Sequence, residues 1–170
     1  MVNTGDWGEF KLSDLFDVTG SKTTKVDDLE EYGPGKYPYV TTKASNNGIE
    51  GFFNYYTEQG GCLTIDSAVI GYCSFQKNNF SASDHVEVLR PKFEMNENIA
   101  LFLVTIINLD CYKYSYGRKR SQKQINKDVI KLPVDEKGDP DWNYMNNYIE
   151  TMQSIEKRRV VLELGISDDN

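Results

Sequence analysis

Aromatic residues lead into a strongly basic stretch in the second half of the chain. Tyr112, Tyr114 and Tyr116 alternate at period two, which in an extended segment predicts three rings on one face. The lysines and serines that follow can bind phosphate groups, while arginine and glutamine can form bidentate hydrogen bonds with guanine and adenine. These residue types indicate a surface that binds nucleic acid. Its candidate contacts are Tyr116, Gly117, Arg118, Lys119, Arg120, Ser121, Lys123 and Gln124.

A second polar loop, residues 41–47, supplies hydrogen-bond donors, acceptors and one cation. The sequence Asn46-Asn47-Gly48 is typical of a tight turn, in which asparagine and glycine adopt positive φ. We expect this loop to oppose the basic segment across one binding surface. Its candidate contacts are Lys43, Ser45, Asn46 and Asn47.

Charge is segregated along the chain. The sequence carries 19 basic and 26 acidic residues, and this net charge of −7 argues against a nucleic-acid binder. Residues 113–131, however, hold seven basic residues and one acid, so this window is +6 and the remainder is −13. Because charges further apart than about 8 Å are screened at physiological salt, a local positive potential is enough to bind an anion. A solvated loop is the alternative explanation of the basic run.

No complete active site is evident in the sequence. Ser83, Asp84 and His85 are the residue types of a hydrolase triad, but neighbours on a strand point to opposite faces and cannot converge. The element Asp135-Glu136-Lys137 matches a motif of metal-dependent nucleases, yet it falls in a turn rather than on a strand. The three cysteines are widely spaced and His85 is the only histidine, which predicts buried free thiols and no metal site. We therefore expect no catalytic residues.

Turn residues divide most of the chain into short β segments. Strands are predicted at residues 37–42, 51–56, 62–65, 68–75, 85–89 and 129–134, where aromatic and β-branched residues lie between Gly, Pro and Asn breaks. A core helix is predicted at residues 99–109, with Asn96 as its candidate cap. The fold class is therefore α+β, with a mixed β-sheet domain followed by one long C-terminal amphipathic helix.

The apolar pattern becomes helical beyond residue 141. Steps of three and four predict a coiled-coil seam along a helix of about 24 residues, which is ~36 Å long. A charged member of such a seam, here Arg159, can fix the pairing register at a cost in stability. We expect this face to form a homodimer or partner interface; packing on its own domain is the alternative. The seam consists of Met145, Tyr148, Met152, Ile155, Arg159, Leu162 and Ile166.

Composition favours a folded cytoplasmic protein. The 170 residues include 39% hydrophobic and 12% aromatic residues, which is ample for a hydrophobic core. The longest apolar stretch is shorter than the ~20 residues of a membrane span, and the first six residues lack the features of a signal peptide. We expect no membrane partner.

Several short motifs follow one another along the chain. They are Tyr39-Val40-Thr41-Thr42, Asn46-Asn47-Gly48-Ile49, Phe80-Ser81-Ala82-Ser83-Asp84-His85-Val86, Tyr116-Gly117-Arg118-Lys119, Lys131-Leu132-Pro133-Val134 and Pro140-Asp141-Trp142. In this order they resemble the target recognition domains of type I restriction-modification specificity (S) subunits. The resemblance extends from Trp7 to about Ile155, and it includes the S subunits that serve fused restriction-modification enzymes.

The resemblance implies a non-catalytic module that recognises one half of a bipartite sequence in double-stranded DNA. It implies no cofactor on this chain, because methyltransferase subunits bring S-adenosylmethionine. It also implies that restriction subunits are further partners. Residues 1–137 would be the recognition domain, and residues 138–170 a helix for dimerisation and methyltransferase docking. Two copies would then form an isologous dimer that recognises an inverted repeat. The alternative is an S-like fragment that occupies methyltransferase subunits without recognising DNA.

Overall fold

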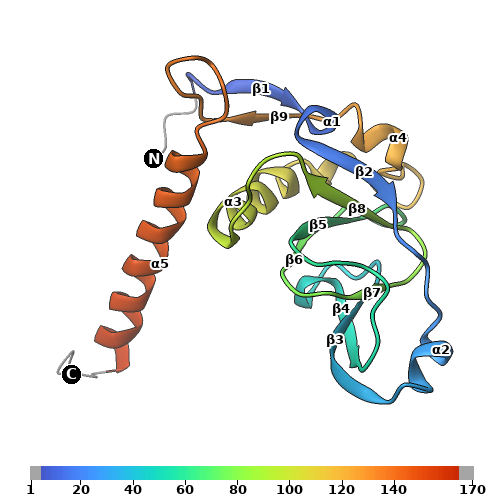
Figure 1. Cartoon of the computed structure of the whole chain (residues 1–170). Coiled ribbons are helices and arrows are strands. Elements are labelled where there is room, and N and C mark those ends of the chain that lie inside the picture. The colour runs from blue at the N-terminus through green and yellow to red at the C-terminus, as the bar shows by residue number, and fades with distance from the viewer. Residues whose placement is uncertain (1–4, 165–170) are drawn as a thin grey trace.

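The structure is a computed structural model that describes residues 5–164, and it confirms the predicted α+β fold class (Figure 1). Its strands are β1 (Gly8–Lys11), β2 (Phe16–Gly20), β3 (Pro34–Val40), β4 (Ile49–Phe53), β5 (Cys62–Asp66), β6 (Cys73–Gln76), β7 (Ser81–Ala82), β8 (Val86–Pro91) and β9 (Val129–Leu132). Its helices are α1 (Leu12–Leu15), α2 (Val26–Glu30), α3 (Glu97–Asn108), α4 (Gln122–Ile125) and α5 (Trp142–Leu164), with short 3-10 helices η1 (Asn46–Gly48) and η2 (Cys111–Lys113).

The strands form three sheets. The central sheet is antiparallel, in the order β2-β8-β5-β6, and β1 pairs with β9 in a separate two-stranded ribbon. The third sheet, β4-β3-β7, is mixed, because β3 is antiparallel to β4 and parallel to β7. In Figure 1 this third sheet lies at the opposite end of the molecule from β1 and β9.

The two central strands β5 and β8 contribute residues to two hydrophobic cores. Leu63 and Ile65 of β5 belong to the larger core, which also holds α3 and the start of α5. Cys62 of β5 and Val88 of β8 belong to the smaller core, together with Phe80. Because both faces of these strands are covered, their sequences are apolar at successive positions rather than strictly alternating.

Helix α3 is fixed at both ends by asparagine side chains. Asn96 Oδ1 accepts the backbone N–H of Ile99 at 2.9 Å, which confirms the predicted cap. At the other end, Asn108 Oδ1 accepts the Cys73 N–H at 2.7 Å, and Asn108 Nδ2 donates to the Cys73 carbonyl at 2.9 Å. These two bonds attach the C-terminal end of α3 to the first residue of β6.

The strand predicted at residues 68–75 is shorter than the apolar pattern indicates. The buried Asp66 carboxylate accepts the backbone N–H groups of Ala68, Val69 and Ile70 at 2.8–3.0 Å. Gly71 then adopts a φ of +72°, and the strand begins only at Cys73. A side chain that bonds to nearby backbone groups offers the chain an alternative to the sheet.

The first turns of α5 pack on the domain itself. Met145 is fully buried, and Trp142 stacks on Phe93 with 3.9 Å between ring centroids. Tyr148 meets Phe102 of α3 edge-on at 5.8 Å. The prediction that Met145 forms a partner interface is therefore wrong, because its side chain is enclosed in the domain's own core. Tyr148 is partly buried against the same core, and its role in a partner interface stays a prediction.

Beyond residue 151, α5 projects away from the sheets (Figure 1). Met152, Ile155 and Leu162 are 39%, 51% and 81% exposed, and Arg159 forms ion pairs with Glu156 and Glu163 of the same helix. The remaining predicted seam residue, at position 166, lies outside the described residues. No helix within residues 5–164 is both long and apolar enough to cross a membrane.

Candidate nucleic-acid interface

The most exposed part of the basic segment is a tight turn, residues 115–119, which we call the tip. Two backbone bonds close it: Arg118 N–H donates to the Ser115 carbonyl at 2.8 Å, and Ser115 N–H donates to the Arg118 carbonyl at 3.2 Å. Tyr116 is 80% exposed, and Lys119 Nζ lies 5.9 Å from the centroid of its ring. Arg118 and Gly117 are also exposed. The tip therefore presents one aromatic ring and two cations to solvent.

Arg120 is placed quite differently, and the prediction that it contacts DNA is wrong. Its side chain is completely buried, with Nε 2.8 Å from Asp128 Oδ2. Its Nη1 donates to the backbone carbonyls of Gly71 and Ile107 at 3.0 and 3.4 Å. A guanidinium group already enclosed by these partners cannot reach a base edge or a phosphate.

The three tyrosines do not share one face. Tyr114 is buried, and its hydroxyl donates to Asp128 Oδ1 at 2.7 Å. Burial, and then this hydrogen bond to a carboxylate, raise the pKa of Tyr114 to about 12. Tyr112 lies on η2 and is 81% exposed, so the extended segment predicted here is interrupted by a helical turn. Only Tyr116 lies on the tip.

The residues after Arg120 begin a short helix. Ser121 is the N-cap of α4, and Lys123 is exposed on its surface. Gln124 Nε2 donates to Asp128 Oδ1 at 3.0 Å, so this amide is engaged within the protein. Of these three side chains, Lys123 is the one whose position best suits a phosphate contact.

The predicted turn at residues 46–48 is confirmed, since Asn46 and Asn47 adopt φ values of +50° and +56°. Asn47 Nδ2 donates to the Phe75 carbonyl at 2.6 Å, which fixes the turn against the end of β6. Lys43 pairs with Glu50 at 3.2 Å, and both side chains are exposed. The loop therefore offers Lys43 and Ser45 to solvent, while Asn47 mainly holds the turn in place.

The two predicted contact segments are attached near opposite ends of β6. The basic segment is held at Gly71 through Arg120, and the asparagine turn is held at Phe75 through Asn47. Both segments are therefore attached to the same stretch of chain, residues 71–75.

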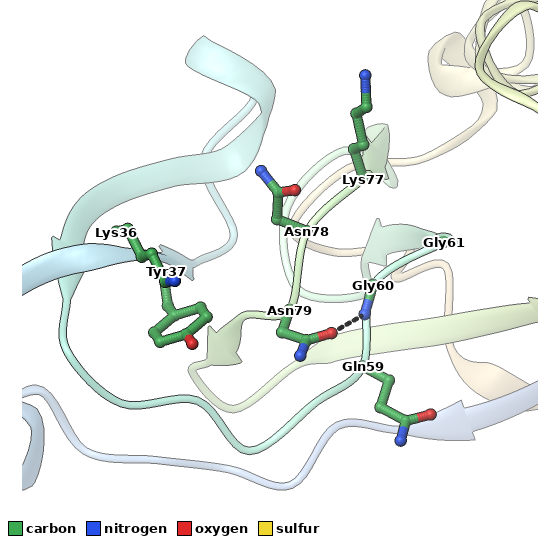
Figure 2. Close-up of a pocket in the computed structure, with 8 residues that line it drawn as sticks. All are labelled: Lys36, Tyr37, Gln59, Gly60, Gly61, Lys77, Asn78 and Asn79. Atoms are coloured by element: carbon green, nitrogen blue, oxygen red, sulfur yellow. Dashed lines mark hydrogen bonds between the residues drawn. The ribbon is translucent and has the colours of Figure 1, made fainter.

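A polar cleft of about 660 Å³ lies beyond the same end of β6 as the asparagine turn, and the sequence interpretation missed it (Figure 2). Figure 2 shows Lys36 and Tyr37 of β3 on one side of the cleft, and residues 77–79 with Gly60 on the other. Asn79 Oδ1 accepts the Gly60 N–H at 3.0 Å. A side chain at position 60 would meet the Asn78 backbone at 2.4 Å, so only glycine allows this close approach.

The cleft combines cations, amides and an aromatic ring, which is the chemistry expected of a DNA surface. It continues into a groove shared by Asn47, Lys77 and Asn78, so it adjoins the asparagine turn. In the sequence, Asn78-Asn79 indicates only a break after a strand. The cleft is lined by Lys36, Tyr37, Gln59, Gly60, Gly61, Lys77, Asn78 and Asn79.

Comparison with known proteins identifies the family. The family model described as "Type I restriction modification DNA specificity domain" matches residues 4–164. The chain belongs to this family. It is 31% identical, over 99% of its own length, to S.BcgI of Heyndrickxia coagulans, the specificity subunit of a type II restriction enzyme. The match covers 50% of that relative, so the chain spans about half the length of that protein.

Solved structures share the fold of this specificity domain. The HsdS subunit of Thermoanaerobacter tengcongensis aligns with a TM-score of 0.62 and 12% identity, covering 96% of this chain and 40% of the HsdS chain. The S subunit of a type I restriction-modification system from M. genitalium aligns with a TM-score of 0.60 and 15% identity, covering 95% of this chain and 43% of that one.

The residues that suggested catalysis have local structural roles in this specificity domain. Ser83 Oγ donates to the backbone carbonyl of Asp84 rather than to His85, so the serine does not join a triad. Asp84 and His85 lie in a turn rather than on a strand, and His85 adopts a φ of +59°. The expectation that these two side chains point apart is therefore wrong, because Asp84 Oδ2 lies 3.6 Å from His85 Nε2. Asp135 Oδ1 accepts the backbone N–H groups of Lys137 and Asp139 at 2.8 and 3.0 Å, which closes the turn before α5. Within residues 5–164, no group of three or more His, Cys, Asp or Glu residues is arranged to hold a metal ion.

Proposed function

We propose that this chain is the DNA-recognising module of a restriction-modification enzyme, and that it binds one half of a bipartite target. Membership of the specificity-domain family over residues 4–164 supports this proposal. The observation that carries it is the tip, where the Tyr116 ring lies exposed beside Arg118 and Lys119. In a chain of net charge −7, such an exposed cationic turn is where the DNA backbone would be attracted.

The exposed side chains divide into two kinds of contact. Arg118 has the planar guanidinium that pairs bidentately with guanine, so it is the proposed base-reading residue. Lys119 and Lys123 carry point charges suited to phosphates, which fix the position of the duplex without selecting a sequence. At the other end of β6, the polar cleft offers the exposed Lys36 for a phosphate and Asn78 for a base, while Lys77 Nζ pairs with Glu97 Oε2 at 2.6 Å.

The module acts through partners in this proposal. Methyltransferase subunits would bind it and supply S-adenosylmethionine, and restriction subunits would join the same cytoplasmic complex. The relative S.BcgI is a specificity subunit of a type II restriction enzyme, which supports a role that directs catalysis rather than performing it. The chain itself would bind no cofactor.

Two copies of this chain would provide two recognition domains. The projecting half of α5 exposes Met152, Ile155 and Leu162, which are spaced as in a heptad seam. Pairing these faces would bury apolar surface that soluble monomers seldom leave exposed. An isologous dimer would recognise an inverted, bipartite sequence.

DNA binding by the complex with methyltransferase subunits tests the proposal. Replacing Arg118 and Lys119 with alanine should weaken cognate binding roughly ten- to hundred-fold, the ~1–3 kcal/mol expected for one guanine contact. The slope of log affinity against log salt should also become shallower by about one for the lost lysine contact. The matched control replaces the exposed Lys25 and Lys137, which removes the same charge from two other segments of the chain and should leave affinity unchanged. Wild-type affinity in the tip variant would contradict the proposal.

A further inference from the structure

The tip lies between two buried side chains that both donate a hydrogen bond to the same carboxylate. Tyr114 precedes the tip, and its hydroxyl donates to Asp128 Oδ1 at 2.7 Å. Arg120 follows the tip, and its Nε donates to Asp128 Oδ2 at 2.8 Å. The guanidinium of Arg120 also lies 4.9 Å from the centre of the Tyr114 ring. Both ends of the exposed turn are therefore tied to one buried residue.

Asp128 is itself held firmly in place. It is 7% exposed, and its backbone carbonyl accepts the N–H of Leu12 at 2.9 Å. Its N–H donates to the carbonyls of Gln124 and Ile125 at 3.0 and 3.1 Å, and Gln124 Nε2 returns a bond to its carboxylate. Contacts with Leu12 of α1 and with Gln124 and Ile125 of α4 therefore fix the position of Asp128, and none of these contacts involves the tip.

Arg120 connects this point to the central sheet and to α3. Its Nη1 donates to the Gly71 carbonyl before β6 and to the Ile107 carbonyl in the last turn of α3. A cation is favoured there, because carbonyl groups at a helix C-terminus lack partners within the helix. A side chain at position 71 would come within 2.6 Å of Arg120 Cδ, so Gly71 leaves the space that the aliphatic part of the Arg120 side chain occupies.

We propose that Asp128 is a positioning residue for DNA recognition, which holds the tip in one conformation through Tyr114 and Arg120. This inference rests on the proposed function of the tip. A loop that is ordered before binding pays less conformational entropy when it meets its target, and it presents its donors in fixed directions. Asp128 would touch no DNA, yet it would set where Tyr116, Arg118 and Lys119 lie.

Two variants test the anchor from different sides. Asp128→Asn removes the ion pair, and Tyr114→Phe removes only one hydroxyl and keeps the ring against Arg120. Tyr112→Phe is the matched control, because Tyr112 is an exposed tyrosine two residues away. A hydrogen bond to a charged group corresponds to roughly a tenfold or larger change in an equilibrium constant. We therefore expect trypsin to cut after Arg118 and Lys119 about tenfold faster in both anchor variants than in the control.

DNA binding by the complex with methyltransferase subunits provides the second measurement. Asp128→Asn also removes a negative charge, so the relevant quantity is the ratio of cognate to mismatched affinity rather than affinity itself. This ratio should fall in both anchor variants and stay unchanged in Tyr112→Phe. A change in fold stability alone would not lower the ratio at temperatures where every variant remains folded. If Asp128→Asn does not fold, Tyr114→Phe decides the question.

The outcomes separate this inference from the proposed function. Unchanged tryptic cleavage in the anchor variants would overturn the anchor. Faster cleavage with an unchanged affinity ratio would also overturn the positioning role, provided that Arg118→Ala lowers the ratio. If Arg118→Ala also leaves the ratio unchanged, the tip does not recognise DNA, and the proposed function of this surface fails together with the inference that rests on it.

Discussion

Replacing Arg120 with methionine should lower the free energy of unfolding by about 3–5 kcal/mol, because the Asp128 carboxylate would remain buried without its cation. The structure supports a value in this range, since Arg120 is fully buried and makes three hydrogen bonds through Nε and Nη1. Small domains are stable by only about 5–15 kcal/mol, so the loss would be conspicuous. The matched control is Arg118→Met, which changes an exposed side chain and should alter stability by about 0.5 kcal/mol or less.

A double variant sharpens this prediction. Arg120 Nη2 is buried with no hydrogen-bond partner among the described residues, so the ion pair carries a desolvation cost that both charges share. Replacing Arg120 with methionine and Asp128 with asparagine together should cost less than the sum of the two single changes, by about 1–3 kcal/mol. Urea denaturation of the full chain, followed by tryptophan fluorescence, measures all four proteins. Equal stability of Arg120→Met and wild type would refute the buried pair.

Three further predictions concern the helix, pH and catalysis. Ile155→Asp should convert a dimer into a folded monomer in light scattering, whereas Lys157→Asp should not; a wild-type monomer at high micromolar concentration would remove the two-copy proposal. The pKa of Tyr114 is raised from the usual 10.0 to about 12, so the stability from its neutral form is present below pH 10 and is lost as the pH rises from 10 to 12. In Tyr114→Phe, the free energy of unfolding, measured by urea denaturation, should therefore fall less between pH 10 and pH 12 than in the wild type. An equal fall in both proteins would contradict a buried hydroxyl. The purified chain alone should neither methylate nor cleave DNA, and magnesium-dependent nicking that disappears in Asp135→Ala would show the opposite.

Local signals in the sequence predict much of the fold. The cap at Asn96 and the left-handed turn at Asn46 and Asn47 depend on side chains acting within a few residues, and both are present. The strand expected at residues 68–75 begins only at Cys73 for a related reason, since Asp66 bonds to the backbone N–H groups of residues 68–70 that a strand would otherwise use. A residue pattern shows which positions are hydrophobic. It does not show where a side-chain carboxylate will accept the backbone N–H groups that would otherwise bond to a neighbouring strand.

The candidate site is harder to predict, because exposure depends on distant segments. Arg118 and Arg120 have the same chemistry and lie two residues apart, yet only Arg120 meets Asp128, Gly71 and Ile107. Likewise, the heptad pattern of α5 runs without a break through Met145, although that residue is already buried in the larger core of the domain. Periodicity identifies an apolar face and cannot identify what covers it.

The polar cleft is the clearest case of a site that no local pattern predicts. Its walls come from β3, from the residues before β5 and from the residues after β6. Each segment alone is typical of a turn or a strand end. The cations and amides become one surface only when Gly60 packs directly against the Asn78 backbone.

The most direct test of the central claim is the pattern of DNA methylation produced by the assembled enzyme. Wild-type chain and the Arg118→Ala variant would each be expressed with the methyltransferase subunits, and the methylated sequences would be read genome-wide. We predict an inverted bipartite motif for the wild type, and for the variant a motif relaxed at one base position in each half, without other change. An identical motif in both strains would contradict DNA recognition by the tip.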